Sequence, residues 1–358
     1  MNKKISIIGT VGIPAKYGGF ETLAEHLTKN LYNQFDITVY CSSKSYDKKL
    51  ETHNNSKLKY INLNANGIQS IPYDIISILK SVKYTDTLLI LGVSGAIILP
   101  FIKLFSKKRI VINIDGLEWK RSKWGKGAKW FLRYSERIAV KYSDVVVTDN
   151  KFIQEYVKFE YDIDSNLIAY GADHVTKETL SDELKTMYPF LNQKYAFKVC
   201  RIEPENNIHI ILEAFKENKY LNIVIIGNWL SSEYGINLKS RYSKMKNINL
   251  IDPIYNQKIL NQIRSNCYIY IHGHSAGGTN PSLVEAMYLE LPIFAYGIQY
   301  NRETTLNKAF YFNNKDELIE LLKNINEKNI KKIAVNMRIL AEENYTWSKI
   351  SKQYSKLF

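Results

Sequence analysis

The residues best suited to chemistry lie in one stretch, 272–287, in which a strand passes through a turn into a helix. The apolar run before it, 267–271, predicts a buried strand. Asn280 is a favourable N-cap and Pro281 suits the first helical position, so we expect a helix to begin there. The turn before that helix can bind phosphate through backbone N–H groups, at the positive end of the helix dipole. The turn residues that we expect to contact phosphate are Gly277, Gly278, Thr279 and Asn280.

Glu285 lies one turn into the predicted helix, beside the phosphate-binding turn. A carboxylate there can accept hydrogen bonds from two neighbouring hydroxyls, such as those of a sugar ring. Phosphate donors next to such an acceptor are typical of a sugar-nucleotide site; an ordinary strand–turn–helix with a surface glutamate is the alternative. His272 and His274 adjoin the turn, where either can hydrogen-bond the donor sugar or the nucleotide, or serve only as a turn residue.

Charged residues directly follow two other predicted strands. Arg201 comes after one of them, where a fixed guanidinium can hold a diphosphate bidentately and stabilise it as it leaves. Asp115 and Glu118 follow the other, where carboxylates can hold a sugar hydroxyl or cap the next helix. We expect Arg201 and Asp115, together with Glu285, to take part in catalysis. The alternatives are a surface arginine and a helix cap.

The first predicted strand is followed by two glycine-containing turns. Gly9 and Gly12 lack the spacing of the dinucleotide fingerprint, which argues against a dehydrogenase. Gly18 and Gly19 instead open the next helix, where they can approach a phosphate or sugar closely, with Glu21 as a polar contact. The alternative is a tight turn that needs a positive φ.

The composition indicates a globular protein with an anionic partner. At 358 residues the chain is long enough for two domains, and 45% hydrophobic against 23% charged residues is typical of a folded protein. Lysine and arginine (49) exceed aspartate and glutamate (35), so the net charge is +14. This favours a nucleic acid, a phosphorylated substrate or an acidic membrane as partner. Three widely spaced cysteines form no metal or redox motif and we expect no signal peptide, so the sequence predicts a cytoplasmic compartment.

Apolar runs alternate with helical patterns along the chain, which predicts parallel sheets covered by helices on both faces. The pattern starts again after residue 175. We therefore predict an α/β protein with two doubly wound domains, residues 1–175 and 176–340. A C-terminal helix in 341–358 is expected to pack back on the first domain. Such domains face each other across a cleft, and ligands bind at the carboxyl ends of their strands.

Residues 119–141 mix aromatic and basic side chains. Such a mixture suits an anionic membrane interface, and a solvated basic face is the alternative. It also suits nucleic acid, but no recognised nucleic-acid motif accompanies it, so we expect no nucleic-acid partner. The side chains concerned are Trp119, Lys120, Arg121, Lys123, Trp124, Lys126, Lys129, Trp130, Phe131, Arg133, Arg137 and Lys141.

Taken together, these motifs resemble family-four retaining glycosyltransferases of GT-B fold, and the resemblance covers the whole chain. It rests on an early Gly-Gly-x-Glu turn, an arginine after the first strand of the second domain, and the glutamate that ends GGTNPSLVE. Within that family, GTVGIPAKYGGFE (9–21), DGLEWKRSKW (115–124) and RIEPENN (201–207) are similar to bacterial rhamnosyltransferases. Those enzymes of capsule and cell-wall synthesis add β-1,4-linked rhamnose to a lipid-linked sugar.

The resemblance implies two Rossmann-like domains, the first binding the acceptor and the second the nucleotide. The implied donor is dTDP-L-rhamnose. The implied acceptor is a lipid-diphosphate-linked glucose or N-acetylglucosamine, in capsule, exopolysaccharide or cell-wall synthesis at the inner face of the bacterial plasma membrane. The departing diphosphate would accept the acceptor's proton on the same face, without a protein nucleophile, a metal or another cofactor. The alternatives are transfer of another hexose from UDP or GDP, and a non-catalytic sugar- or nucleic-acid-binding protein.

The chain departs from the family pattern at the donor sugar. The family has a pair of glutamates eight positions apart, and the first would fall at Gly277. Only Glu285 therefore carries over, as the implied acceptor for ribose hydroxyls. Contacts to the donor sugar are then expected from the backbone of Gly278 and Thr279.

The chain also departs from the pattern at the diphosphate and at the acceptor. The lysine that accompanies the family's arginine falls at Asn206 or Asn207, so Arg201 is the cation that carries over. An acceptor-side histidine of the family falls near Asp115, so the chemistry that orients the acceptor is expected to differ there.

Overall fold

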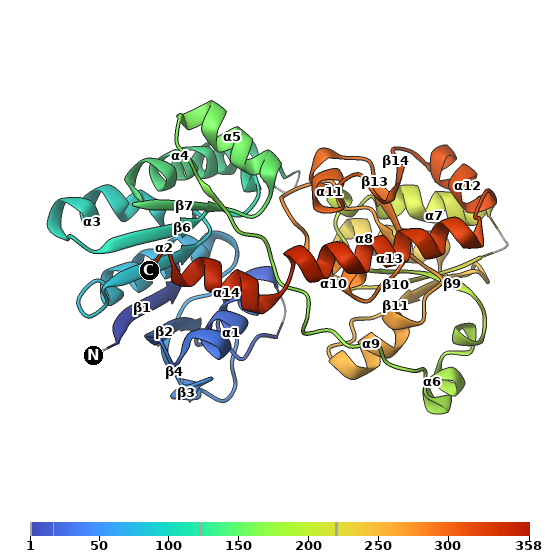
Figure 1. Cartoon of the computed structure of the whole chain (residues 1–358), viewed down its shortest axis with the longest axis horizontal. Helices are drawn as coiled ribbons and strands as arrows, with labels where there is room; N and C mark the ends of the chain where they lie inside the picture. Colours follow the sequence, from blue (N-terminus) through green and yellow to red (C-terminus); the bar gives the residue numbers. More distant parts are fainter. Residues whose placement is uncertain (1, 17, 122–123, 219–220) are drawn as a thin grey trace. The chain divides into compact units, whose positions relative to one another are not determined.

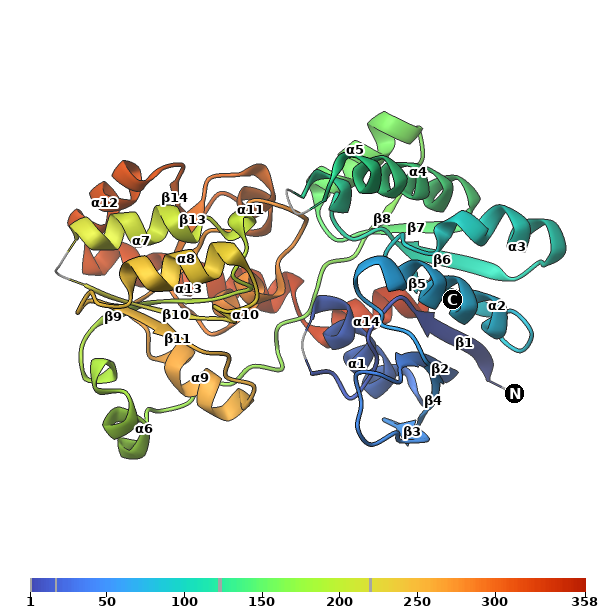
Figure 2. The ribbon, with the colours of Figure 1, turned by 180° about the vertical axis from the view of Figure 1, so that it is seen from behind.

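The computed structural model describes residues 2–16, 18–121, 124–218 and 221–358. Tyr17 of the motif 9–21, and Ser122 and Lys123 of the motif 115–124, lie outside these ranges. The chain forms two compact units, residues 1–170 with 347–358, and residues 171–346. The boundaries expected from the sequence are 175 and 340. Figures 1 and 2 show a helix-covered sheet in each unit, which is the predicted α/β class.

An eight-stranded sheet forms the centre of the first unit, in the order β3-β4-β2-β1-β5-β6-β7-β8. Its neighbouring strands are parallel except β3 and β4. The central strand β5 is buried along its whole length, as a sheet covered on both faces requires. The strands are β1 (Lys3–Ile8), β2 (Phe35–Ser42), β3 (Thr52–His53), β4 (Ser56–Ile61), β5 (Thr87–Leu91), β6 (Arg109–Asn113), β7 (Val145–Thr148) and β8 (Asn166–Leu167).

The helices of the first unit form a layer on each face of this sheet. Right-handed crossovers that run in opposite directions along a sheet place their helices on opposite faces. Accordingly α3, α4 and α5 share one face, and α1 packs with α14 on the other (Figures 1 and 2). The helices are α1 (Gly19–Leu31), α2 (Ser70–Ser81), α3 (Leu99–Phe105), α4 (Lys126–Tyr142), α5 (Lys151–Tyr161) and α14 (Trp347–Ser355), with short 3-10 turns η1 (Gly67–Gln69), η2 (Ala96–Ile98) and η3 (Glu118–Lys120).

A six-stranded parallel sheet, in the order β11-β10-β9-β12-β13-β14, forms the centre of the second unit. Its strands are β9 (Tyr195–Val199), β10 (Asn222–Ile226), β11 (Ile248–Ile251), β12 (Ile269–His272), β13 (Ile293–Tyr296) and β14 (Phe310–Phe312). The helices are α6 (Asp182–Met187), α7 (Ile208–Glu217), α8 (Glu233–Tyr242), α9 (Gln257–Ser265), α10 (Pro281–Tyr288), α11 (Gln299–Thr304), α12 (Lys315–Lys323) and α13 (Glu327–Asn344), with 3-10 turns η4 (Pro189–Asn192) and η5 (Pro204–Asn206).

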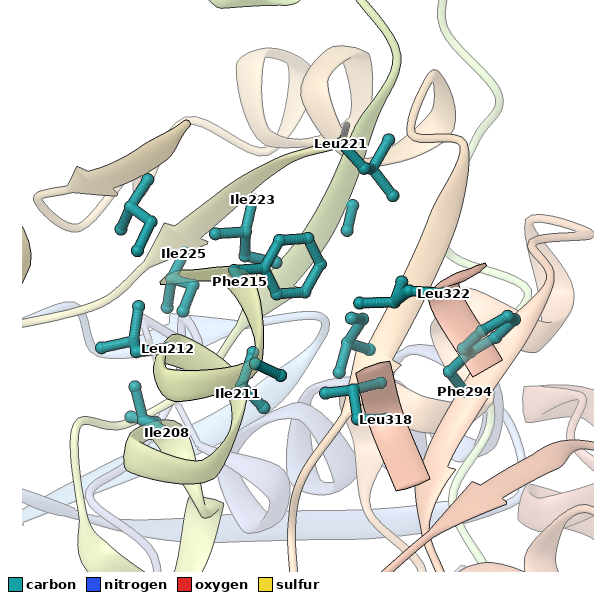
Figure 3. Close-up of a cluster of buried hydrophobic side chains, with 14 of the residues drawn as sticks. Ile208, Ile211, Leu212, Phe215, Leu221, Ile223, Ile225, Phe294, Leu318 and Leu322 are labelled. Carbon is teal, nitrogen blue, oxygen red and sulfur yellow. The ribbon is translucent and has the colours of Figure 1, made fainter. Parts of the chain in front are cut away.

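The core of the second unit packs helices α7 and α12 against the sheet (Figure 3). Ile211 and Phe215 of α7, Ile223 and Ile225 of β10 and Leu318 of α12 are buried there together. The apolar residues of α7 recur at helical spacing, so one face of the helix covers the strands. This packing fixes the strands whose carboxyl ends carry the candidate site.

The C-terminal helix α14 completes the first unit. Trp347 stacks on His26 of α1 with ring centroids 4.2 Å apart. Ser351 Oγ accepts a hydrogen bond of 3.0 Å from Asn30 Nδ2. The Tyr354 hydroxyl accepts one of 2.8 Å from Asn113 Nδ2, at the end of β6. The last helix of the chain is therefore part of the same compact unit as the N-terminal residues.

No helix of the described residues is both long and apolar enough to cross a membrane.

Two tryptophans test the contribution of α14. Trp347 is 3% exposed, so we expect Trp347→Ala to lower the free energy of unfolding of the first unit by about 3–5 kcal/mol. Trp130, on α4, is 71% exposed, and Trp130→Ala should change stability by at most about 0.5 kcal/mol. Urea denaturation followed by circular dichroism measures both. Equal effects of the two substitutions would contradict this account of α14.

Candidate functional site

The turn that joins β12 to α10 has the shape that the sequence predicts. The side-chain oxygen of Asn280 accepts a hydrogen bond of 3.0 Å from the backbone N–H of Ser282, so Asn280 is the N-cap and Pro281 the first helical residue. Gly277 has a φ of +89°, a backbone conformation that favours glycine. Gly278 and Thr279 are buried and complete the turn before the helix. The predicted phosphate-binding residues therefore lie together at the N-terminus of α10.

Two asparagines tie this turn to the loop that follows β9. Asn207 Nδ2 donates to the carbonyl of Gly273 (2.9 Å), and Asn206 Nδ2 donates to the carbonyl of Arg201 (2.8 Å). His274 Nδ1 lies 3.2 Å from Asn206 Oδ1. The contact is so close that a Cβ on Gly273 would lie 2.3 Å from the carbonyl oxygen of Asn206. The asparagines at the family's lysine position thus hold the Arg201 loop against the phosphate turn.

Arg201 lies two residues after the end of β9, separated from it by Cys200, and its side chain is 45% exposed. Its Nε lies 3.8 Å from Glu203 Oε2, a distance that leaves the pair weak at the surface. The guanidinium therefore sits at the carboxyl end of the sheet, attached to a loop whose backbone is fixed.

Glu285 is held by two cationic or proton-donating side chains that the sequence analysis did not single out. Its Oε2 accepts a hydrogen bond from Arg264 Nη1, and its Oε1 lies 3.1 Å from His174 Nε2. Burial alone would raise the pKa of Glu285, but the charge of Arg264 and the contact with His174 outweigh it and lower the pKa to about 2. The carboxylate is therefore ionised at physiological pH.

His272 and His274, the two histidines predicted to adjoin the ligand, are both buried. His272 ends strand β12 and is 1% exposed, and within the described residues neither of its ring nitrogens has a hydrogen-bond partner. Burial lowers the pKa of His272 well below its ordinary value, and nearby Lys198 and His274 lower it further, so the ring is neutral. Both histidines lie inside the protein beside the turn.

In the first unit, Gly18 and Glu21 fix the loop after β1. Gly18 is the N-cap of α1 with a φ of +121°, and a Cβ there would lie 1.9 Å from Glu21 Oε2. Glu21 accepts hydrogen bonds from the Thr10 hydroxyl (2.9 Å) and the Val11 backbone N–H (2.7 Å). Gly19 opens the helix. The carboxylate predicted to bind substrate thus holds the glycine-rich loop.

Glu118 likewise holds its own loop. It lies 2.9 Å from Arg121 Nε and accepts a hydrogen bond of 3.0 Å from Trp124 Nε1. Trp119 in turn donates to the buried carboxylate of Glu136 (3.2 Å). The indole N–H groups of Trp119 and Trp124 are therefore both hydrogen-bonded to carboxylates, which fixes the two rings.

Asp115 has a different setting from Glu118. It lies two residues after the end of β6 with a φ of +61°, and its backbone N–H donates to Asn113 Oδ1 (2.9 Å). It acts electrostatically, as Glu21 does, on the buried Tyr170, whose pKa is raised well above its ordinary value chiefly by burial. Asp115 therefore lies in a loop at the carboxyl edge of the first sheet, the edge to which β1 also delivers the loop that contacts Glu21.

Comparisons with known families describe the two halves of the chain separately. Residues 182–343 match the family model described as "Glycosyl transferases group 1", and residues 2–173 match one described as "Domain of unknown function (DUF1972)". An uncharacterized glycosyltransferase of Methanocaldococcus jannaschii is 24% identical over 388 residues, which cover 95% of this chain and 94% of that protein.

Solved structures of similar fold span nearly the whole chain. Sucrose-phosphate synthase from Thermosynechococcus elongatus has a TM-score of 0.83 at 12% identity, covering 99% of this chain and 98% of that one. HepE of Anabaena, in complex with UDP and glucose, has a TM-score of 0.77 at 12% identity, covering 99% of each chain. These likenesses, with the match to group 1 glycosyltransferases, confirm the predicted GT-B fold of two Rossmann-like domains.

Removing the carboxylate of Glu285 would leave the buried guanidinium of Arg264 without its counter-charge. We expect Glu285→Ala to lower the free energy of unfolding at neutral pH by about 3–5 kcal/mol. The folded-state pKa of about 2 lies below the ordinary 4.5. The stabilisation by the ionised carboxylate is therefore fully present above about pH 4.5 and is lost as the pH falls to about 2.

Urea denaturation at several pH values measures this effect. The double variant Arg264→Met/Glu285→Leu removes both charges and should recover most of the lost stability. If Glu285→Ala were as stable as the wild-type protein at pH 7, the ion pair would not have the importance assigned to it.

Proposed function

We propose that this chain, a glycosyltransferase of GT-B fold, transfers L-rhamnose from dTDP-L-rhamnose to a glucose or N-acetylglucosamine that a diphosphate links to a lipid. The new bond is β-1,4, and the donor's anomeric configuration is retained. The observation that carries the proposal is the joint occurrence of three rhamnosyltransferase-like motifs, each beginning at or just after the carboxyl end of a strand: 9–21 after β1, 115–124 after β6 and 201–207 after β9. The polymer served is a capsule, an exopolysaccharide or a cell-wall polysaccharide.

In this proposal the second unit binds the nucleotide sugar. The turn Gly277–Asn280 and the N-terminus of α10 hold the diphosphate, and Glu285 accepts a hydrogen bond from the sugar of the nucleotide. Arg201 stabilises the charge that grows on the leaving diphosphate. The departing oxygen of the diphosphate takes the proton of the acceptor hydroxyl on the same face of the sugar, so no protein nucleophile is needed.

The first unit binds the acceptor in this proposal. Asp115, which lies two residues after the end of β6, orients the acceptor hydroxyl. The hydrogen bonds of Glu21 to Val11 and of Glu118 to Trp124 help to shape that binding surface. We place the histidines of the phosphate turn, His272 and His274, around the donor as supports of the turn rather than as exposed ligands, because both are buried.

Rhamnose is favoured as donor by the turn itself. Rhamnose carries a methyl group where hexoses carry a hydroxymethyl group, so a carboxylate is of less use there. Gly277 stands where the related transferases have a glutamate, in agreement with such a donor. An apolar contact rejects an extra hydroxyl only about a hundredfold, so weak use of other dTDP-sugars is compatible with this role.

A second donor class has a specific observation in its favour. HepE of Anabaena, which shares the fold, has been solved in complex with UDP-glucose. Transfer of a hexose from UDP or GDP is therefore the alternative to rhamnose transfer.

We further propose that the enzyme works at the inner face of the bacterial plasma membrane, docked on anionic lipid through α3 and α4. Phe101, Leu104 and Phe105 of α3 are exposed, as are Trp130 and Tyr134 of α4. Exposed apolar side chains of this size rarely cluster on a soluble surface without a partner.

The charges of these two helices favour a lipid partner. Within α3, α4 and the loop 106–108 the carboxylate is Glu136, which is buried, whereas the basic residues are Lys103, Lys107, Lys108, Lys126, Lys129, Arg133, Arg137 and Lys141. A second copy of the chain on this face would set positive charge against positive charge. An anionic bilayer instead accepts both the aromatic and the basic side chains.

The reaction is tested with purified protein, dTDP-L-rhamnose and a glucosyl- or N-acetylglucosaminyl-diphospho-lipid. We expect a product with one added rhamnose whose anomeric configuration is that of the donor. Arg201→Lys keeps the charge but loses the planar fork, so turnover should fall more than donor affinity. Transfer only from UDP- or GDP-hexoses would refute the donor, and an inverted product would refute the mechanism.

Membrane docking is tested by sedimentation with phosphatidylglycerol-containing vesicles. Binding should fall with salt, and Lys126→Glu/Lys129→Glu should weaken it. Leu104→Ser/Phe105→Ser should weaken it by roughly tenfold or more through lost apolar contact. Leu230→Ser, which changes an equally exposed apolar residue of the second unit, is the control and should have no effect. Binding to neutral vesicles that is insensitive to salt would contradict the proposal.

A further inference from the structure

Glu136, on α4, is a carboxylate that is 1% exposed and accepts hydrogen bonds from three side chains. Its Oε1 accepts from the hydroxyls of Tyr156 (2.8 Å) and Tyr161 (2.7 Å), and its Oε2 accepts from the indole Nε1 of Trp119 (3.2 Å). The two tyrosines belong to α5, which packs beside α4, and Trp119 belongs to η3. One carboxylate therefore connects three elements of the first unit.

Hydrogen bonds, rather than a counter-ion, stabilise the charge of Glu136. Within the described ranges no lysine or arginine forms an ion pair with it, and Arg133 instead pairs with Glu160 at 2.9 Å. Burial raises the pKa of Glu136, and the three hydrogen bonds, together with the charge of Arg133, oppose that rise. A buried carboxylate is costly without hydrogen bonds, so Glu136 needs its donors and in turn holds each of them in place.

The three donors depend on Glu136 to different degrees. A tyrosine hydroxyl can rotate and can both donate and accept, and the hydroxyls of Tyr156 and Tyr161 lie 3.4 Å apart. The indole N–H of Trp119 can only donate, and it does so in the plane of the ring. An acceptor at Glu136 Oε2 therefore fixes the ring of Trp119, whereas each tyrosine keeps a second partner within reach.

Trp119 lies in the middle of the segment 115–124, next to Glu118. The contacts of Glu118 with Trp124 and Arg121 lie within this segment and shape it locally. The bond from Trp119 instead leads out of the segment to α4. Because Glu118 and Trp119 are neighbours in the 3-10 turn η3, the bond that fixes Trp119 also fixes the backbone that carries Glu118.

We propose that Glu136 is a positioning residue for acceptor binding, because it holds Trp119 and thereby fixes the segment 115–124 on the first unit. The inference rests on the proposed role of that segment in binding the acceptor sugar. Glu136 is buried, so it acts through Trp119 and does not touch the substrate. Without this bond the indole can turn away from α4, and the acceptor must then order the segment as it binds. The donor site is built from residues of the second unit and keeps its affinity.

The test measures the KM of the full-length protein for a short-chain glucosyl-diphospho-lipid, which needs no vesicle, with dTDP-L-rhamnose as donor. Glu136→Met keeps a similar volume but removes every acceptor, so the acceptor KM should rise roughly tenfold or more, as expected for a lost hydrogen bond to a charged group. Glu136→Gln should restore an acceptor KM close to that of the wild-type protein. Its carbonyl oxygen can accept from the indole while its amide N–H groups donate to the tyrosines. Donor affinity, measured by calorimetry, should not change.

A second variant and a matched control keep the test independent of folding. Glu136→Met leaves three donors without an acceptor and can unfold the first unit. Trp119→Phe removes only the indole donor, leaves the two tyrosines on the carboxylate, and should raise the acceptor KM by a similar factor. Tyr161→Phe removes one donor from the same carboxylate but not the bond to Trp119, so it is the control and should leave the acceptor KM unchanged.

Three results would overturn the inference: an acceptor KM unaffected by Trp119→Phe, an equal rise in Tyr161→Phe, or an equal loss of donor affinity in Trp119→Phe. The first would show that the bond does not position the acceptor segment, and the other two would show a general structural effect. A wild-type protein that transfers no rhamnose to this acceptor would instead overturn the proposed function.

Discussion

The structure depends on how the irregular loops at the carboxyl edges of its two parallel sheets are held. Every parallel strand delivers its following loop to that edge, where the backbone leaves the regular hydrogen-bond ladder and must find other partners. Buried polar side chains supply them: Glu21 accepts the N–H of Val11, and Asn207 donates to the carbonyl of Gly273. These bonds to the backbone set the shape of each loop before any ligand arrives.

Because polar side chains hold these loops, several residues of the motifs have a structural role. Glu21 and Glu118 have the residue types of sugar ligands, yet each accepts hydrogen bonds within its own loop. Glu285 is also engaged, by Arg264 and His174, and it remains ionised because the guanidinium outweighs the effect of burial. The carboxylates of these long motifs therefore set the geometry of their loops. The side chains that remain exposed, such as Arg201, are then presented from fixed loops.

The sequence was sufficient for the fold class, because continuous apolar runs mark strands that are buried on both faces. The run 267–271, predicted as a buried strand, overlaps β12. The strands β3, β8 and β14 have two or three residues each and lie at sheet edges, where the apolar signal in the sequence is short. The prediction from sequence missed Arg264. A signal was present, since Arg264 shares the buried face of α9 with Leu260 and Ile263, where an arginine needs a counter-charge. His174 had none, because its partner is 111 residues away.

The departures from the family pattern also have a backbone explanation. Gly277 has a φ of +89°, where a glutamate would be strained, so the loss of that carboxylate goes with a particular shape of the turn. Asn207 has a φ of +47°, which asparagine tolerates better than most residues, and its amide bonds the phosphate turn. A lysine there would lose that bond. The asparagines thus provide a rigid connection between the two loops at the position where the resemblance places a lysine.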